Sequence, residues 1–266
     1  MTILINCNAD YFTYNNVSSE EYELILASID TTINQEVGGG FEYTTYRNAK
    51  SPQHKMQEIK YEKSFEYEVE FLSPYTKLDD KFNEICNWLL NRSNFAKFKL
   101  NSWSDEYINC IFTDAEKIQL FGEEGYGIYG IKATLKADSV FKWSEVSTTY
   151  TYDELVNTVN LENNTDVREY TYPTLIIKTG ETGGDIVVQN VSDNNRLISI
   201  TDALPNDTIT ISSFPKTITS LLKNREPLYE SFNKKFPRLM QGTNNIGIVG
   251  DISELTFNYK IGKVIN

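Results

Sequence analysis

The sequence contains a single histidine, His54, and this scarcity removes several kinds of catalytic site. Ser-His-Asp and Cys-His nucleophiles need a histidine as base, and no Gly-x-Ser-x-Gly turn accompanies His54. One histidine also excludes a metal site with several histidine ligands. We therefore interpret His54 as a surface residue, and we expect no catalytic residue, no metal and no cofactor.

Cysteine is also sparse, with Cys7, Cys86 and Cys110 far apart and no Cys-x-x-Cys spacing. This pattern argues against a disulfide framework or a zinc site, so we interpret the three as small apolar side chains. The first residues carry no basic region before an apolar run, and no stretch reaches transmembrane length. We expect no secretion signal, no membrane anchor and folding in a cytoplasm.

Two further binding motifs are incomplete. Gly38-Gly39-Gly40 lacks the Lys-Ser/Thr pair that a phosphate-binding loop uses. Asp193-Asn194-Asn195 lacks the spaced carboxylates and terminal glutamate of a calcium-binding EF-hand loop. The net charge of −12 repels phosphate and anionic lipid, so we expect no stable binding of nucleic acid or membrane.

What the sequence has in abundance is aromatic residues, 17 Tyr and 14 Phe among 266 residues, and these favour strands. We divide the chain into residues 1–145 and 146–266, because residues 144–151 are polar and the pattern changes there. For the first part we predict a mostly antiparallel, barrel-like β-sheet with one helix, an α+β domain.

The most regular alternation in the first part predicts one long strand over residues 59–71, with Tyr67, Val69 and Phe71 on the apolar face. The other face carries Glu66, Glu68 and Glu70, which we expect to face solvent or cations of a neighbouring subunit. Before this strand, residues 47–55 are polar and lack periodicity, so we predict an exposed loop.

Spacings of four, three and four residues between Leu78, Phe82, Ile85 and Leu89 predict the helix, packed on the apolar face of that strand. Trp88 widens its buried side. After the helix we predict short strands at 95–100, 107–112 and 118–121, and a long strand at 126–137.

The second part is typical of a β-sandwich or jelly roll, because short strands alternate with turn residues at regular intervals. Ile246, Ile248, Leu255, Phe257 and Tyr259 alternate with polar or small residues around Gly250-Asp251, which predicts a closing hairpin.

The order of these segments resembles the distal tail proteins of long-tailed bacteriophages. The features that carry the resemblance are an Asn-rich turn at 163–166, the Tyr172-Pro173 entry to an apolar strand, an acidic turn before the 208–211 strand, and a closing Phe-Pro-x-Leu then Gly-x-Asn arrangement. The last of these includes Phe236, Pro237, Gly242 and Asn244. Gln241 departs from the family, where a proline often precedes the glycine.

The resemblance implies a galectin-like second domain and a structural role at the tip of a tail in the virion. By this resemblance the chain forms a homohexameric ring, through which DNA passes, that joins the tail tube to tape-measure, tip or receptor-binding proteins. The resemblance also implies a long β-hairpin arm in the first domain. We expect this inter-subunit arm to be formed by residues 38–55 and the ends of the long strand, including Arg47, Pro52, His54, Lys55, Ile59 and Tyr61.

Two alternatives stay open. One is a carbohydrate-binding sandwich with an accessory domain, in which Tyr152, Tyr170, Tyr172 or Tyr229 stack on sugar rings. All three tryptophans, however, lie before residue 146. The other is a hydrolase that uses carboxylates such as Asp105 and Glu106. A fold of this type does not by itself assign either activity.

Overall fold

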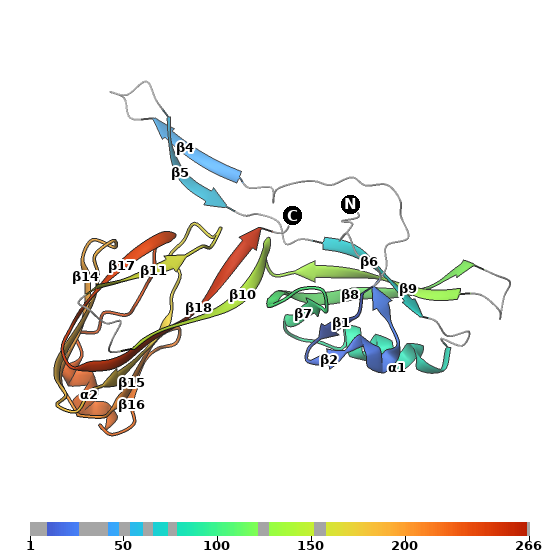
Figure 1. The fold of residues 1–266 in the computed structure, drawn as a ribbon. Helices are drawn as coiled ribbons and strands as arrows, with labels where there is room; N and C mark the ends of the chain where they lie inside the picture. The colour runs from blue at the N-terminus through green and yellow to red at the C-terminus, as the bar shows by residue number, and fades with distance from the viewer. Residues whose placement is uncertain are drawn as a thin grey trace. The chain divides into compact units, whose positions relative to one another are not determined.

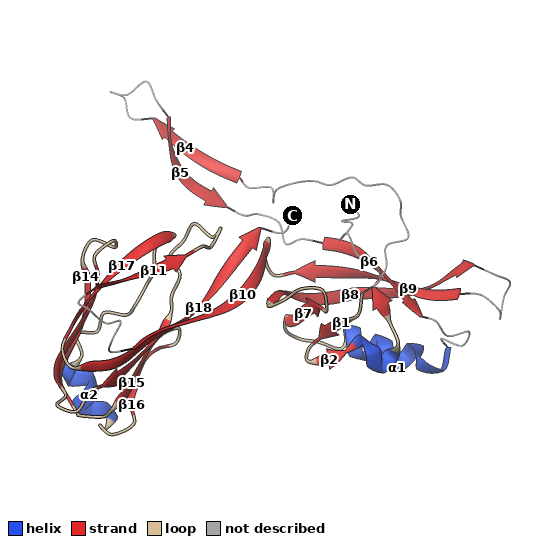
Figure 2. Ribbon diagram, viewed as in Figure 1, coloured by secondary structure: helices blue, strands red, loops and turns tan. Residues whose placement is uncertain are grey.

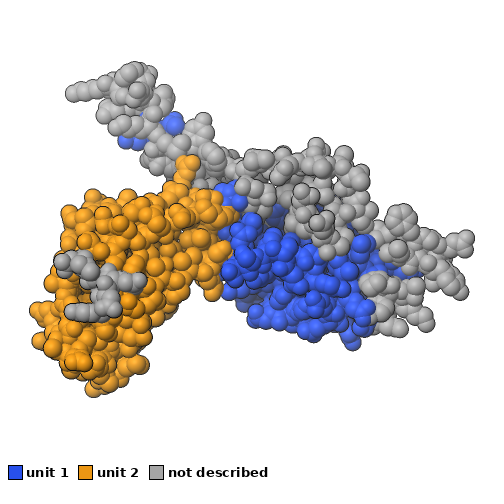
Figure 3. Space-filling model, in the orientation of Figure 1, with its two compact units in different colours: residues 1–142, 264–266 blue, residues 143–263 orange. Residues whose placement is uncertain are grey.

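The structure, a computed structural model, describes residues 10–26, 42–47, 54–60, 66–73, 79–121, 128–151 and 158–264. It forms two compact units, residues 1–142 with 264–266 and residues 143–263 (Figure 3). Strands dominate both, as predicted (Figure 2). Each unit is described by itself.

The first unit is an antiparallel sheet in the order β2-β1-β7-β8-β9-β6-β3 (Figure 1). A two-way pair of backbone hydrogen bonds between Asp10 and Leu26, at 3.1 and 2.8 Å, joins β3 back to the chain just before β1. The ladder thus returns to where it began, which gives the barrel-like character that the sequence predicted. The strands are β1 Phe12–Tyr14, β2 Val17–Ser18, β3 Ile25–Leu26, β6 Glu66–Ser73, β7 Ala96–Leu100, β8 Glu106–Phe121 and β9 Ile128–Ala137; a 3-10 helix, η1, spans Ser19–Tyr22.

The helix α1, Asp79–Leu90, lies against β8 on the buried side of this sheet. Ile85, Trp88 and Leu89 join the core. The Trp88 ring stacks on Phe12, with centroids 5.7 Å apart, and its indole N–H donates to the Tyr14 carbonyl at 3.3 Å. The predicted helix is therefore confirmed, although Leu78 lies outside the described residues and the main strand contact of the helix is β8, not the strand predicted over 59–71.

The single long strand predicted over 59–71 is wrong. Its two ends belong to different sheets: β5, His54–Lys60, pairs with β4, Glu42–Arg47, whereas β6 pairs with β9 and β3. Apolar alternation that is broken only at Lys63 fits one strand or two, because period 2 does not report which neighbour a strand pairs with.

The loop predicted over 47–55 also needs correction at its ends. Arg47 pairs with His54, and Tyr46 pairs with Lys55, so these residues form the far end of a two-stranded ribbon. Polar strands carry no apolar alternation, which is why the pattern did not reveal them.

Two predicted short strands, 107–112 and 118–121, are parts of the single 16-residue strand β8. The register with β9 shifts between Phe112 and Asp114, which marks a β-bulge and interrupts the alternation there.

The second unit is a β-sandwich. One sheet has the order β16-β15-β12-β18-β10, and the other has the order β11-β17-β13-β14. Apolar side chains from both sheets form one core, including Leu175, Ile211, Ile248 and Phe257. The strands are β10 Phe141–Thr151, β11 Thr158–Asn163, β12 Thr174–Thr179, β13 Gly184–Asn190, β14 Arg196–Ala203, β15 Thr208–Ser213, β16 Lys216–Ser220, β17 Gly242–Val249 and β18 Ile252–Val264.

The predicted closing hairpin is wrong, because β17 and β18 lie in opposite sheets and do not pair with each other. Both bury alternate residues in one core, so the pattern is the same as in a hairpin. Gly250 makes the crossing, with φ of +113°, and a Cβ there would lie 2.4 Å from the Asp185 carbonyl oxygen. Only glycine fits both requirements.

A second helix, α2, spans Arg225–Ser231 and was not predicted. It has seven residues, and its buried Leu228 lies four residues before buried Phe232. Asn224 at the N-cap position and Pro227 in the first turn are compatible with a helix start, and they are the signals that could have found it.

Candidate functional site

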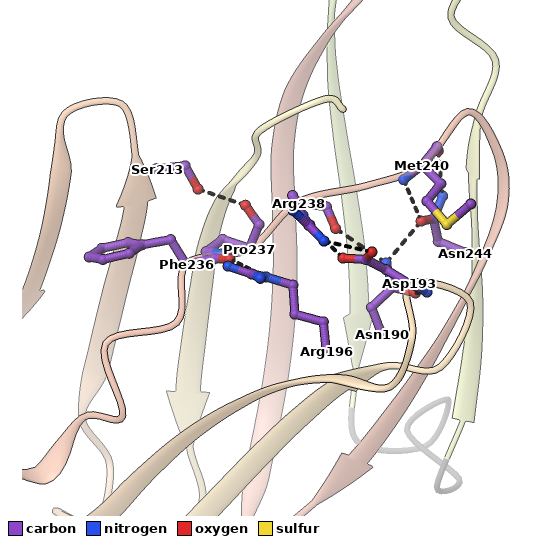
Figure 4. A network of polar contacts seen from close by, with 9 residues as sticks. All are labelled: Asn190, Asp193, Arg196, Ser213, Phe236, Pro237, Arg238, Met240 and Asn244. Atoms are coloured by element: carbon purple, nitrogen blue, oxygen red, sulfur yellow. Dashed lines mark hydrogen bonds and ion pairs between the residues drawn. The ribbon is translucent and has the colours of Figure 1, made fainter. Parts of the chain in front are cut away.

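We define the closing segment as residues 232–246; Figure 4 shows the landmark residues Phe236, Pro237 and Asn244 of this segment with their polar contacts. The segment first runs along the edge of β14. Asn233 N–H donates to the Ser199 carbonyl and its side chain donates to the Leu197 carbonyl, both at 3.0 Å. The Arg196 Nε donates to the Phe236 carbonyl at 2.9 Å. The edge of this sheet is thereby covered by a segment of the same chain.

The two proline landmarks meet at one hydroxyl. Ser213 Oγ donates to the Pro237 carbonyl at 2.7 Å and lies 3.5 Å from the Pro173 carbonyl. Thr171, two residues before Pro173, and Leu239, two residues after Pro237, exchange backbone hydrogen bonds of 2.9 and 2.7 Å. The entry at Tyr172-Pro173 and the approach at Phe236-Pro237 are therefore one structural unit, although 64 positions separate the two prolines in the sequence.

Asn244, a third landmark, is fully buried and uses its whole amide. Its Oδ1 accepts from Met240 N–H at 2.8 Å and from Asn190 Nδ2 at 2.9 Å. Its Nδ2 donates to the carbonyls of Met240 and Gly242 at 2.8 and 3.0 Å. Gly242 has φ of +87° and starts β17. These bonds fix the turn by which the segment enters the sandwich.

Sequence reasoning missed the strongest contact in this region. Arg238 Nε and Nη2 bind the two carboxylate oxygens of Asp193 at 2.6 and 2.9 Å. The Asp193 side chain is fully buried, and this bond raises the pKa of the Arg238 guanidinium. The guanidinium also stacks over Tyr170, 4.0 Å from the ring centroid. From the sequence we interpreted Asp193 as an ordinary turn residue, because the sequence pattern does not show which carboxylates in turns become buried.

Of the expected arm residues, Arg47, His54, Lys55 and Ile59 lie in the β4–β5 ribbon, whereas Pro52 and Tyr61 lie outside the described residues. The ribbon pairs with no other strand in the described part of the chain. Tyr46 in β4 is 47% exposed. A lone two-stranded ribbon is at best marginally stable in water.

The glutamates on the polar face of β6 have cationic partners in the same chain. Glu66 pairs with Lys136 at 2.8 Å, and Glu68 pairs with Lys132 at 3.0 Å, across the β6–β9 register. The side chains of Glu66 and Glu68 keep 58% and 49% of their surface exposed, so the expected solvated face is confirmed, and the cations that pair with them come from the same chain. Of the proposed hydrolase pair, Asp105 is exposed and Glu106 forms an ion pair of 2.9 Å with Lys142.

Within the described ranges, no group of three or more His, Cys, Asp or Glu residues is arranged to hold a metal ion. The helices described there are also too short or too polar to cross a membrane.

Comparison with models of protein families shows which family this chain belongs to. The model of a phage tail protein N-terminal domain matches residues 7–139, and that of a phage tail C-terminal domain matches residues 141–259. The chain belongs to this family of phage tail proteins. It is thus related to structural components of phage tails. None of the curated proteins matches it.

A solved structure shows the same fold for this phage tail protein. The crystal structure of the Dit protein of phage SPP1, described as a paradigm of the hub adsorption apparatus in phages that infect Gram-positive bacteria, aligns with a TM-score of 0.65. The identity is 12%, over 94% of this chain and 98% of that one. The phage p2 baseplate, activated with Ca, gives a TM-score of 0.48 and 12% identity over 98% and 100% of the two chains. The resemblance to distal tail proteins is confirmed.

Proposed function

We propose that this phage tail protein is the ring-forming hub at the distal end of the tail. Six copies form a closed ring that joins the tail tube to the tip and receptor-binding proteins, and the particle is assembled in the host cytoplasm. The observation that carries the proposal is the fold match to SPP1 Dit over nearly all of both chains. A match of this extent covers both units and not one widespread domain.

We propose further that the β4–β5 ribbon is the arm that grips the next subunit. Ring closure needs a heterologous contact, in which one surface binds a different surface of the neighbour. The ribbon supports this role because it pairs with no other described strand and exposes Tyr46. A neighbouring subunit supplies the strand pairing that the ribbon does not find among the described strands of its own chain.

The test is mass measurement of the purified full chain by light scattering, with negative-stain imaging. We expect six times the 30.5 kDa chain mass and a ring with a central hole. A strict monomer at tens of micromolar would reject the hub proposal.

Deletion of residues 47–55 tests the arm separately, together with Tyr46→Asp. Val249→Asp, at a comparably exposed position in the second unit, is the matched control. We expect both arm variants to lose the ring and the control to keep it. A ring that persists in the deletion variant would reject the arm and leave the hub proposal standing.

A further inference from the structure

The second unit contains a basic segment in an acidic protein. The whole chain has 25 Lys and Arg against 37 Asp and Glu, whereas residues 216–238 have six Lys and Arg against two Glu. A local charge opposite to that of the molecule attracts an acidic partner and lets the rest of the surface repel unspecific anions.

Three lysines of this segment have no carboxylate partner among the described residues: Lys216, Lys234 and Lys235. All three are exposed. By contrast, three other lysines of this unit do form ion pairs. Lys178 binds Glu254, Lys260 binds Glu145, and Lys263 binds Asp166.

Aromatic side chains lie between and beside these cations. Lys216 Nζ lies 5.9 Å from the Phe236 ring centroid, and Lys234 Nζ lies 4.9 Å from that of Tyr229. Phe214 is 73% exposed, and Tyr172 packs edge-on against it with centroids 5.1 Å apart.

The hydrogen bond from Ser213 to Pro237 holds the turn between β15 and β16 beside the closing segment, so these side chains form one surface. We name it the basic aromatic surface, formed by Tyr172, Phe214, Lys216, Tyr229, Lys234, Lys235 and Phe236.

We propose that the basic aromatic surface binds an acidic segment, containing aromatic residues, of another protein of the tail tip. This inference rests on the proposed hub function, which supplies such a partner. Charge complementarity selects the acidic character of the segment, and aromatic side chains are enriched at protein interfaces.

A neutral sugar fits this surface less well. Arg238 already gives its Nε and Nη2 to Asp193, and its guanidinium covers one face of Tyr170. These two groups, which lie outside the basic aromatic surface, are therefore engaged within the chain, and the neutral dextran probe tests whether the exposed rings of Tyr172, Phe214 and Tyr229 bind sugar instead.

The experiment measures binding of fluorescent poly(Glu,Tyr) copolymer to the full chain at low salt, with poly-Glu, dextran sulfate and neutral dextran as further probes. The site variant is K216Q/K234Q/K235Q, and the matched control is K178Q/K260Q/K263Q, which removes the same charge from the same unit. We expect at least a tenfold rise in Kd for the copolymer in the site variant and less than twofold in the control.

Phe214→Ser tests the aromatic part, and it removes a side chain that is mostly exposed. We expect this substitution to raise the Kd for the copolymer several-fold and to leave the Kd for poly-Glu unchanged. Three results would overturn the proposal: no copolymer binding to the wild type, equal weakening in both lysine variants, or preference for dextran sulfate or neutral dextran over the copolymer.

Oligomeric mass is measured on the same samples. If the protein forms a ring but does not bind the copolymer, the proposal of an acidic partner is rejected and the hub proposal stands. A monomer that binds it through these lysines rejects the hub and leaves the docking surface in place.

Discussion

Arg238 and Asp193 form a two-point ion pair that joins the closing segment to the turn between β13 and β14. The Asp193 carboxylate is fully buried, while the Arg238 side chain keeps 28% of its surface exposed. The arginine is therefore the group that makes a buried negative charge tolerable at this place. Asn190 Nδ2 adds a bond of 3.2 Å to the Arg238 carbonyl, so that side chain and backbone are both held (Figure 4).

The first prediction concerns this pair. Arg238→Ala leaves the Asp193 carboxylate buried without a cation, and we expect a loss of about 3–5 kcal/mol in the free energy of unfolding. Arg238→Lys keeps the charge but not the two parallel bonds, and we expect an intermediate loss. Urea denaturation measures both.

The control is Lys178→Ala, which breaks an ion pair of 2.8 Å with Glu254 at an exposed position. Exposed pairs contribute about 0–1 kcal/mol. An Arg238→Ala effect no larger than that of this control would contradict the role given to the buried pair.

The second prediction concerns the Asn244 amide. Asn244→Ala leaves the Met240 N–H and the Asn190 amide without this acceptor, and an unsatisfied buried group costs about 1–3 kcal/mol. We expect a loss in that range by urea denaturation. The neighbouring Asn245 is exposed, so Asn245→Ala is the control and should change stability by less than about 0.5 kcal/mol. Equal effects would mean that the amide network contributes nothing.

These contacts show where sequence reasoning reached its limit. The strands and α1 were predicted because burial on one side of an element leaves a period of 2 or 3.6 residues. The pairing of strands produces no such periodicity in the sequence. One strand was therefore predicted where β5 and β6 belong to two sheets, and a hairpin was predicted where β17 and β18 lie in opposite sheets.

The residues of the closing segment show the same difference between local signals, which the sequence reveals, and distant contacts, which it does not. Pro173 and Pro237 were identified as landmarks because proline and glycine act locally on the backbone. Ser213, Asp193 and Arg238 were not, because their partners lie 24, 45 and 45 positions away and only the fold brings them together. Their burial comes from the sandwich and not from their neighbours in the sequence.

The third prediction concerns Gly242, whose φ is +87°. A Cβ at this position would meet no atom within 4 Å, so space does not limit the substitution. Gly242→Ala should nevertheless cost about 1–2 kcal/mol, because the left-handed region is unfavourable for residues with a Cβ. Gly247→Ala is the matched control within the same strand, with ordinary contacts of 3.8 Å and no left-handed φ. If Gly247→Ala proved the more destabilising in thermal unfolding, the backbone explanation would be wrong.

The last prediction concerns pH and the crossing between the sheets. The Asp251 carboxylate accepts from Thr182 Oγ1 and N–H at 2.5 and 2.6 Å, and from Gly183 N–H at 3.1 Å. The hydrogen bond from the Thr182 hydroxyl, followed by those from the two backbone groups, lowers the pKa of this carboxyl below its ordinary value. A carboxyl whose pKa is lower in the folded state stabilises the fold at a pH above its unfolded pKa of about 3.9.

That stabilisation is lost as the pH falls from about 4 toward the folded pKa, since the folded state must then take up a proton where its oxygens accept three bonds. Asp251→Asn removes the titrating group, so we expect its thermal midpoint to lie below that of the wild type at pH 6 and the difference to narrow toward pH 3. The comparison uses midpoints measured by circular dichroism across this range. A difference that stays constant with pH would mean that Asp251 holds the crossing by shape alone and not by its charge.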